Sequence, residues 1–295
     1  MYTLGLTINV VEWIQSFQTD FLDFFFIAIS FIGEQYVYIT VIGIVYWTYN
    51  KKFGEFLGIS LACTSVANNT LKEIVNAPRP FMEYPNRINN LRSSTSTGMS
   101  FPSGHTQNFS TFLFAIAFYL KKKWIFITAS ILVVLMMISR MYLGVHYLED
   151  VVAAAIIGLI IAYTLHHYYN KIYDNQKLLH KIYLITILIS LPITLILGSE
   201  DLFKAYGILC GVMLAVMYEK KNVNFTLDVS SLKKTIRVIL GLIIMLSLQV
   251  GLKELYSPFL EEGTYLFDVF SSIRYFLLSF IGLGLYPILF KKFNF

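Results

Sequence analysis

The chain has 295 residues, of which 56% are hydrophobic and 14% charged, and its mean hydropathy is +0.63. A soluble domain averages about 25% charged residues, so this composition excludes an ordinary soluble enzyme and indicates an integral membrane protein. The net charge of +5 does not indicate a nucleic-acid partner, because the basic residues lie in short clusters between apolar runs. Such clusters are typical of the cytoplasmic loops of membrane proteins.

The apolar pattern predicts an all-α, polytopic membrane helix bundle. An amphipathic segment at 9–22 comes first and is predicted to lie in the membrane interface. A transmembrane helix needs about 20 apolar residues. Runs that approach this length fall, in chain order, at 24–48, 54–71, 105–120, 124–141, 148–166, 182–198, 203–218, 236–252 and 267–290. We therefore expect nine transmembrane helices, or ten if 9–22 also crosses the membrane.

The lysines and arginines give these helices a direction. Most of them fall at one end of the predicted spans, for example at Lys51–Lys52, Lys121 to Lys123 and Lys220–Lys221. Loops rich in Lys and Arg stay on the cytoplasmic side. The opposite, non-cytoplasmic side then receives the loop 77–104 and the turn near 142–147.

Two groups of polar residues are predicted at that non-cytoplasmic surface, one near each end of the 77–104 loop. Lys72 and Arg79 are seven residues apart, about two helical turns, so we expect them to share a helical face. The cluster Pro102-Ser103-Gly104-His105 is expected to open a membrane helix. Backbone amides at a helix N-terminus bind anions.

A third group follows the next predicted span. Arg140 is followed by His146 and Asp150, and the last two are four residues apart, which would make them neighbours on one helical face. Three cations, two histidines and one carboxylate at a single surface indicate an anionic substrate.

Together these groups resemble the three-part signature of the type 2 phosphatidic acid phosphatases (PAP2), a superfamily that includes vanadium haloperoxidases and glucose-6-phosphatase. The matching residues are Lys72-x6-Arg79-Pro80, Pro102-Ser103-Gly104-His105 and Ser139-Arg140-x5-His146-x3-Asp150. The resemblance covers about residues 50–165. The stretch 31–47 is also similar to the first span of sphingosine-1-phosphate phosphatases and glucose-6-phosphatases. We therefore expect a phosphatase core of the six-helix type at 1–170, with the amphipathic segment at its start, and additional transmembrane helices at 171–295.

The chemistry of these residues agrees with the roles that the resemblance implies. His146 is the expected nucleophile, and Asp150 fixes its tautomer by accepting a hydrogen bond from one ring nitrogen. His105 is the expected general acid, which later activates water. The remaining site residues are expected to bind the phosphate; they are Lys72, Arg79, Arg140, Ser103 and Gly104.

No second acidic cluster suited to Mg²⁺ accompanies Asp150, so we predict a metal-independent hydrolase without a cofactor. The expected substrate is a membrane lipid phosphate, either a monoester or a diphosphate, cleaved on the extracytoplasmic side of a bacterial cell membrane. Other readings stay open: a polyprenyl diphosphate such as undecaprenyl diphosphate, a soluble sugar phosphate, a lipid phosphotransferase, or a transporter. The sequence leaves the oligomeric state open.

The loop 81–104 contains two further arginines, Arg87 and Arg92. Two interpretations of them are open. They contact a headgroup or a second phosphate of the substrate, or they lie in the zone of the lipid headgroups.

Overall fold

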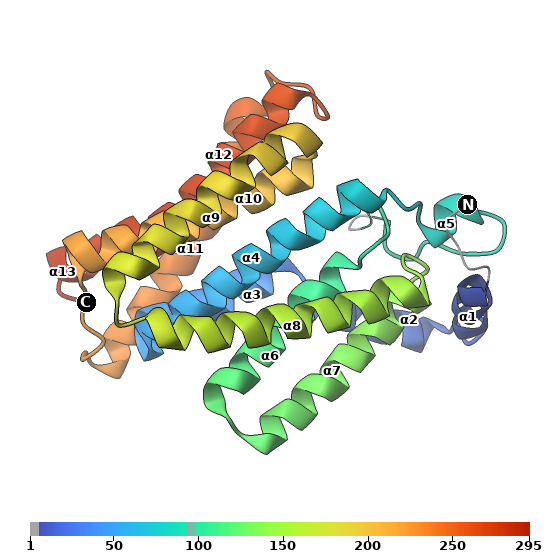
Figure 1. The fold of residues 1–295 in the computed structure, drawn as a ribbon, viewed down its shortest axis with the longest axis horizontal. Helices are drawn as coiled ribbons and strands as arrows, with labels where there is room; N and C mark the ends of the chain where they lie inside the picture. The colour runs from blue at the N-terminus through green and yellow to red at the C-terminus, as the bar shows by residue number, and fades with distance from the viewer. Residues whose placement is uncertain (1–5, 94–95, 97) are drawn as a thin grey trace. The chain divides into compact units, whose positions relative to one another are not determined.

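The structure, a computed structural model, describes residues 6–93, 96 and 98–295, and within these ranges it is helical and contains no strand (Figure 1). Three residues of the 81–104 loop, 94, 95 and 97, therefore lie outside the described residues. The helices, in chain order, are α1 (Leu6–Gln15), α2 (Asp20–Ile32), α3 (Gln35–Ile44), α4 (Lys51–Val75), α5 (Pro80–Glu83), α6 (Gly104–Leu120), α7 (Lys123–Tyr142), α8 (Leu148–Ile172), α9 (Gln176–Leu197), α10 (Glu200–Tyr218), α11 (Ser231–Tyr256), α12 (Tyr265–Phe280) and α13 (Tyr286–Lys292). Short π-helical segments continue three of them, at Val45–Tyr49, Glu219–Val223 and Ile281–Leu285.

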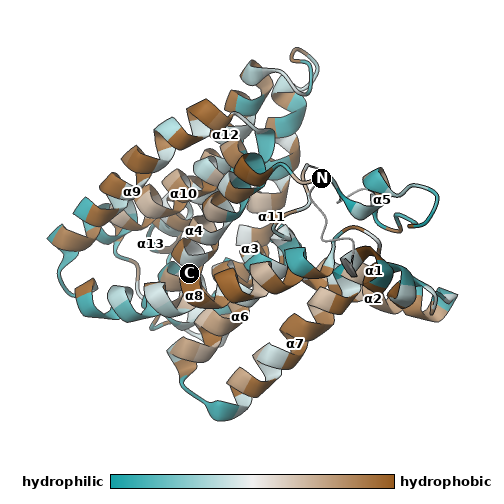
Figure 2. Cartoon of the chain, turned by 45° about the vertical axis from the view of Figure 1, so that its right-hand side comes forward, coloured by the Kyte–Doolittle hydropathy of each residue, from teal (hydrophilic) through white to brown (hydrophobic). Residues whose placement is uncertain are grey.

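Six helical stretches of the described chain are long and apolar enough to cross a membrane. They are Lys123–Tyr142, Leu148–Ile172, Gln176–Leu197, Glu200–Val223, Ser231–Tyr256 and Tyr265–Lys292. A seventh results if α2 and α3, which are bent by 48°, form one span. Figure 2 shows hydrophobic residues along α7 and α9 and hydrophilic residues at the connection between α6 and α7. The count of nine or ten transmembrane helices is not confirmed.

Two predicted spans, α4 and α6, are missing from this set, α6 because it has only 17 residues and α4 because it carries many polar and charged residues. Helix α4 contains the buried residues Glu55, Asn68 and Lys72, and α6 opens with the sequence Gly-His-Thr-Gln-Asn. Polar side chains on membrane helices are placed where they face protein, so apolarity alone underestimates such helices.

The apolar run 24–48 is not one continuous helix. Helix α2 ends at Ile32 and α3 begins at Gln35, with Gly33 between them. A Cβ atom on Gly33 would lie 2.6 Å from the side chain of Met136 and 3.4 Å from ring atom Cδ2 of His105. Glycine therefore lets this bend pack closely against α7 and α6, and the bend becomes part of the surroundings of His105.

The segment 9–22, predicted as one amphipathic helix, is interrupted. Helix α1 ends at Gln15, and Thr19 caps α2 by accepting a hydrogen bond at Oγ1 from the backbone N–H of Leu22 (3.3 Å). On α1, Ile8 and Val11 are buried in a cluster with residues of the 81–93 loop, α7 and the start of α8, which are Ile88, Met141, Tyr147 and Val151. The apolar face of α1 is thus covered by protein.

The chain divides into two compact units. The first comprises the residues up to Tyr38 together with Ala67–His167, and the second comprises Ile39–Val66 and Tyr168–Phe295. The residues singled out by the sequence pattern all belong to the first unit. The division at residue 170 that the sequence suggested stays a prediction.

In the first unit, small residues bring α6 and α8 together. A Cβ atom on Gly158 of α8 would lie 2.7 Å from the carbonyl oxygen of Gln107 and 2.8 Å from Cβ of Ser110. Ser110 Oγ donates to the carbonyl oxygen of Ala155 (2.8 Å), and Thr111 Oγ1 donates to that of Gly158 (3.2 Å). Close packing through small residues and side-chain hydrogen bonds is usual for membrane helices. It places the N-terminal ends of α6 and α8 side by side.

In the second unit, two buried carboxylates are paired with lysines. Lys51 Nζ lies 2.7 Å from Glu219, and Lys220 Nζ lies 2.8 Å from Glu55. Both carboxylates are shielded from solvent, so these pairs satisfy charges that would otherwise be costly to bury.

Candidate active site

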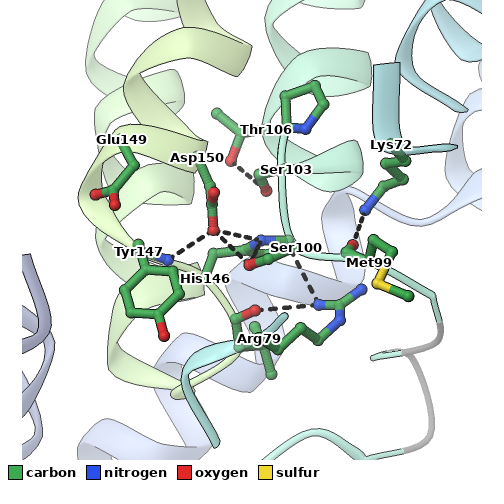
Figure 3. A network of polar contacts seen from close by, with 12 residues as sticks. Lys72, Arg79, Met99, Ser100, Ser103, Thr106, His146, Tyr147, Glu149 and Asp150 are labelled. Carbon is green, nitrogen blue, oxygen red and sulfur yellow. Dashed lines mark hydrogen bonds and ion pairs between the residues drawn. The ribbon is translucent and has the colours of Figure 1, made fainter. Parts of the chain in front are cut away.

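The three sequence clusters meet at one end of the first unit. The C-terminal ends of α4 and α7, the N-terminal ends of α6 and α8 and the loop at 98–103 supply the residues (Figure 3). Polar contacts join the three clusters directly, as the next paragraphs describe. The clusters therefore form a single site, as their positions in the sequence predicted.

His146 is the centre of this network. Its ring atom Nδ1 lies 3.3 Å from Asp150 Oδ2, and Nε2 lies 3.2 Å from Arg79 Nη1. A carboxylate only accepts hydrogen bonds and a guanidinium only donates them. The two partners therefore place the proton of the neutral ring on Nδ1 and leave a lone pair on Nε2. A histidine in this state can attack an electrophile with Nε2.

The electrostatic surroundings keep His146 uncharged. Its side chain is 1% exposed. Burial, followed by the positive charges of Arg79, Lys72 and Arg140, holds the pKa of His146 well below its ordinary value of 6.5. The ring is consequently neutral at pH 7, which a nucleophile requires.

The contact between His146 and Asp150 arises differently from the predicted one. Helix α8 begins at Leu148, so His146 precedes the helix and does not share a helical face with Asp150. Asp150 is the third residue of α8 and turns back to accept a hydrogen bond from the backbone N–H of Tyr147 (2.8 Å), as in a capping box. The cap orients the carboxylate toward the ring of His146.

Ser100 is a site residue that the sequence pattern did not reveal. Its hydroxyl donates to Asp150 Oδ2 at 2.5 Å and lies 3.4 Å from His146 Nδ1. Ser100 is completely buried, and its backbone N–H donates to the carbonyl oxygen of Ala77 (2.8 Å). It lies in a Ser- and Thr-rich loop, where nothing in the sequence distinguishes it from its neighbours.

Lys72 and Arg79 both reach the site, although they do not share a helical face. Helix α4 ends at Val75, Asn76 has a left-handed backbone (φ 51°), and Arg79 is the N-cap residue of α5. Lys72 Nζ donates to the carbonyl oxygen of Met99. Arg79 Nε donates to the carbonyl oxygen of Gly98 (2.9 Å), and its Nη1 donates to that of Val145 (3.1 Å). Both cations thereby hold the loop that carries Ser100.

Arg140 is fully buried and only partly hydrogen-bonded. Its Nη1 donates to Ser30 Oγ at 2.5 Å, whereas Nε and Nη2 have no partner among the described residues. The buried Nε2 atom of His105 also lacks a partner within that part of the chain. Buried donors without acceptors are costly, and an anion placed between these groups would satisfy them. Arg140 binds Ser30, and His105 packs against Gly33 three residues further along the chain, so both side chains contact the end of α2.

Ser103 and Gly104 form the start of α6. Ser103 is its N-cap residue, and its hydroxyl accepts a hydrogen bond from Thr106 Oγ1 (3.0 Å) (Figure 3). The backbone N–H of Ser103 donates to the carbonyl oxygen of Asp150 (3.2 Å). A Cβ atom on Gly104 would lie 3.2 Å from Asn68 Oδ1, so glycine allows α6 to begin close to α4. A contact of Ser103 or Gly104 with phosphate stays a prediction.

Among the residues that the structure describes, no group of three or more His, Cys, Asp and Glu side chains is placed to hold a metal ion. Metal independence of the reaction stays a prediction.

Two family models match the chain. Residues 55–174 match the family described as PAP2 superfamily. Residues 203–295 match a second family, described as PAP2 superfamily phosphatase, transmembrane extension. With its apolar helices, the chain is therefore a multi-pass integral membrane protein.

Among the similar proteins are three phosphatases. Lipid phosphate phosphatase delta of Arabidopsis thaliana is 26% identical over 160 residues, which are 50% of this chain and 38% of that protein. Phosphatidylglycerophosphatase B of Bacillus subtilis is 30% identical over 144 residues, 45% of this chain and 67% of that protein. Undecaprenyl-diphosphatase of Sulfolobus acidocaldarius is 31% identical over 159 residues, 52% of this chain and 74% of that protein.

The extent of these matches differs between the relatives. The chain spans less than half the length of the Arabidopsis protein, but 74% of the Sulfolobus protein at 31% identity. The family matches cover both the stretch that carries the site and the C-terminal helices. The chain belongs to the PAP2 superfamily of membrane phosphatases.

Proposed function

We propose that this chain hydrolyses a lipid phosphate, either a monoester or a diphosphate, at the non-cytoplasmic face of the membrane, through a phosphohistidine intermediate and without a metal ion. The observation that carries the proposal is the placement of His146 between Asp150 and Arg79, with its Nε2 lone pair directed toward a cluster of cations. The relatives whose names mention phosphatidylglycerophosphate and undecaprenyl diphosphate support a lipid substrate.

In the first step, Nε2 of His146 attacks phosphorus. The bond from phosphorus to the leaving oxygen breaks, and His105 gives its proton to that oxygen, so the lipid product departs neutral at that position. Arg79 Nη1 lies 3.2 Å from Nε2. A phosphate oxygen that accepts this N–H in place of Nε2 frees the lone pair for the attack.

Three cations stabilise the charge on the transferred group. In phosphoryl transfer the charge is spread over three equatorial oxygens, and preorganised donors at those oxygens lower the barrier. Arg140 offers two buried nitrogens that have no acceptor among the described residues, while Arg79 and Lys72 contribute donors from beside the loop 98–100. The planar guanidinium groups suit the binding of a phosphate by two hydrogen bonds.

In the second step, water hydrolyses the phosphohistidine. His105, now neutral, takes a proton from the water, the oxygen attacks phosphorus, and the bond between phosphorus and Nε2 breaks. Inorganic phosphate leaves, and His146 and His105 return to their initial states. Asp150 stays bound to Nδ1–H throughout and stabilises the positive charge that the ring carries while it is phosphorylated.

The proposed side of the membrane follows from the basic clusters. Within the first unit, the site lies where α6 begins and α7 ends, whereas Lys121 to Lys123 lie where α6 ends and α7 begins. The cluster of lysines indicates the cytoplasmic end of these helices. This argument supports a site at the opposite, non-cytoplasmic end.

The test is phosphate release by the purified chain in detergent, without added metal, from phosphatidic acid, sphingosine 1-phosphate, undecaprenyl diphosphate and glucose 6-phosphate. We expect release from at least one lipid substrate, an acid-labile phosphorylated protein during turnover, and neither in the variant His146→Ala. Turnover near the wild-type rate in His146→Ala would contradict the proposed nucleophile. A phosphorylated acceptor in place of free phosphate would identify a phosphotransferase, and uptake into vesicles without phosphate release would identify a transporter.

A further inference from the structure

A fourth cation, Arg92, lies outside the three sequence clusters. It is part of the loop between α5 and α6, where its backbone N–H donates to Asn90 Oδ1 (3.0 Å). Its Nη2 donates to Glu34 Oε1 in an ion pair. Glu34 directly follows Gly33 at the bend between α2 and α3, the bend that packs against His105. The ion pair therefore joins the loop to the part of the fold that surrounds the expected proton donor.

The contacts join Arg92 to the surroundings of the proton donor. Gly33 packs against ring atom Cδ2 of His105, and Glu34, the next residue, pairs with Arg92. The contacts of His146 run instead to Arg79, Ser100 and Asp150.

Arg92 retains a free donor in a shielded position. The side chains of Arg92 and Glu34 are only 18% and 15% exposed. Nε of Arg92 is buried and has no hydrogen-bond partner in the described ranges of the chain. Glu34 thus occupies one edge of the guanidinium group and leaves a second donor open to an anion.

Arg87 lies in the same loop and differs from Arg92 in its contacts and in its exposure. Its Nε and Nη2 donate to the two carboxylate oxygens of Glu12 at 3.1 Å and 2.5 Å, and Nη2 also donates to Asn9 Oδ1 (3.2 Å). The side chains of Arg87 and Glu12 are 41% and 45% exposed. The Arg87 pair is therefore exposed, with both carboxylate oxygens of Glu12 bound, whereas the Arg92 pair is shielded.

We propose that Arg92, oriented by Glu34, binds the second phosphate of a lipid diphosphate and makes this chain favour diphosphates over monophosphates. The inference rests on the proposed function. In a diphosphate, the leaving oxygen that His105 protonates is bonded to the second phosphorus, so that phosphate lies beyond His105, on the side where Arg92 lies. His146 takes the terminal phosphoryl group, the bridging P–O bond breaks, and one water then releases orthophosphate, leaving the lipid monophosphate. Arg92 stabilises the charge that the departing phosphate gains.

The experiment compares kcat/KM for farnesyl diphosphate with that for farnesyl phosphate, two probes that share one chain and differ by one phosphate. We expect Arg92→Gln to lower the ratio of diphosphate to monophosphate by about tenfold or more, because one charge-assisted hydrogen bond to the second phosphate is lost. The matched control Arg87→Gln should leave the ratio as in the wild type. Glu34→Gln should keep or raise the ratio, because the amide oxygen of glutamine can still accept the hydrogen bond that orients Arg92, while the negative charge that competes with the second phosphate is removed.

Two results would overturn the inference while the proposed function stands. One is an unchanged ratio in Arg92→Gln in a protein that still hydrolyses both probes. The other is an equal loss of the ratio in Arg92→Gln and Glu34→Gln, which would make the ion pair a structural contact. Phosphate release by the wild type from neither probe nor any other lipid phosphate would contradict the proposed function itself.

A binding measurement keeps the inference testable if Arg92→Gln does not fold. The conservative variant Arg92→Lys keeps the charge but loses the planar pair of donors. We expect it to weaken inhibition by methylenediphosphonate more than inhibition by orthophosphate. Equal weakening of both inhibitors would contradict a site for the second phosphate.

Discussion

Replacing Asp150 with asparagine tests the centre of the proposed mechanism. Asp150 Oδ2 receives hydrogen bonds from Ser100 Oγ (2.5 Å) and Tyr147 N–H (2.8 Å), and it lies 3.3 Å from His146 Nδ1. An asparagine oxygen can still accept from Tyr147, so the cap of α8 and the fold should survive. What is lost is the negative charge beside a ring that becomes positive when it is phosphorylated.

The size of the effect follows from the distance. At an effective dielectric constant of about 20, opposite unit charges 3.3 Å apart attract each other by about 5 kcal/mol. If half of the positive charge has developed on the ring in the transition state, about 2.5 kcal/mol of this attraction is available there. Since each 1.36 kcal/mol changes a rate tenfold, Asp150→Asn should lower kcat/KM by between about 70-fold and about 5,000-fold.

The assay is kcat/KM on the preferred lipid phosphate, with thermal unfolding as a check on the fold. Glu149→Gln is the matched control, since it makes the same change in the same helical turn. Glu149 Oε1 accepts a hydrogen bond from Thr7 (3.0 Å) and is directed away from His146 (Figure 3). A folded Asp150→Asn variant that retains more than a tenth of the wild-type kcat/KM would refute the assigned role of the carboxylate.

Three further predictions concern proton transfer, metal and pH. His105→Ala should retain more activity on an activated aryl phosphate than on a lipid phosphate, because a good leaving group needs no proton donor. Arg140→Ala should lower the activity on the two substrates similarly. The same ratio of kcat/KM for the two substrates in both variants would contradict this division of roles. Activity should survive EDTA and be inhibited by vanadate, which mimics the transition state of phosphoryl transfer; complete loss with EDTA and recovery with Mg²⁺ would overturn the metal-free mechanism. Because the pKa of His146 is held well below 6.5, the ring should stay neutral as the pH falls through 6.5. The acidic limb of the profile of kcat/KM against pH should therefore lie below 6.5, and a limb above this value would contradict a buried, uncharged nucleophile.

The identity of the site could be predicted from residue types and their order, because charged residues are costly in membrane helices and are kept there for chemistry. The cations, the histidines and Asp150 were expected at one surface, and the structure brings Arg79, His146 and Asp150 into direct contact. The prediction rests on the topology of the membrane helices. Helix ends that alternate between two membrane surfaces leave few places where such residues can meet.

The local geometry could not be predicted from spacing. Lys72 and Arg79 were expected on one helical face, but α4 ends at Val75, and the two side chains meet through the carbonyl oxygens of Gly98 and Met99. His146 and Asp150 meet through a helix cap. Spacing rules assume a continuous helix, and here both pairs lie where a helix ends or begins.

Long-range contacts account for the remaining differences. Ser100 belongs to the site because its hydroxyl reaches Asp150, 50 residues later in the chain. Ser30 belongs to it because it binds Arg140, 110 residues away. The bend at Gly33 interrupts an apolar run, and only the side chains of Met136 and His105 that pack on this glycine explain it. Composition and periodicity carry no information about partners at such distances.

The cations of the site have two opposing effects on His146, and phosphate binding changes the balance of the two effects. They keep His146 uncharged, but Arg79 Nη1 also contacts the Nε2 atom that would attack. A phosphate group brings a charge of about −1.5 to −2 at neutral pH and strong acceptor oxygens. It can accept the N–H of Arg79 and satisfy the unpartnered donors of Arg140, and only then is Nε2 free. In the proposed mechanism, the nucleophile is therefore exposed by the group that it attacks, which protects a neutral buried imidazole from other electrophiles until a phosphate is bound.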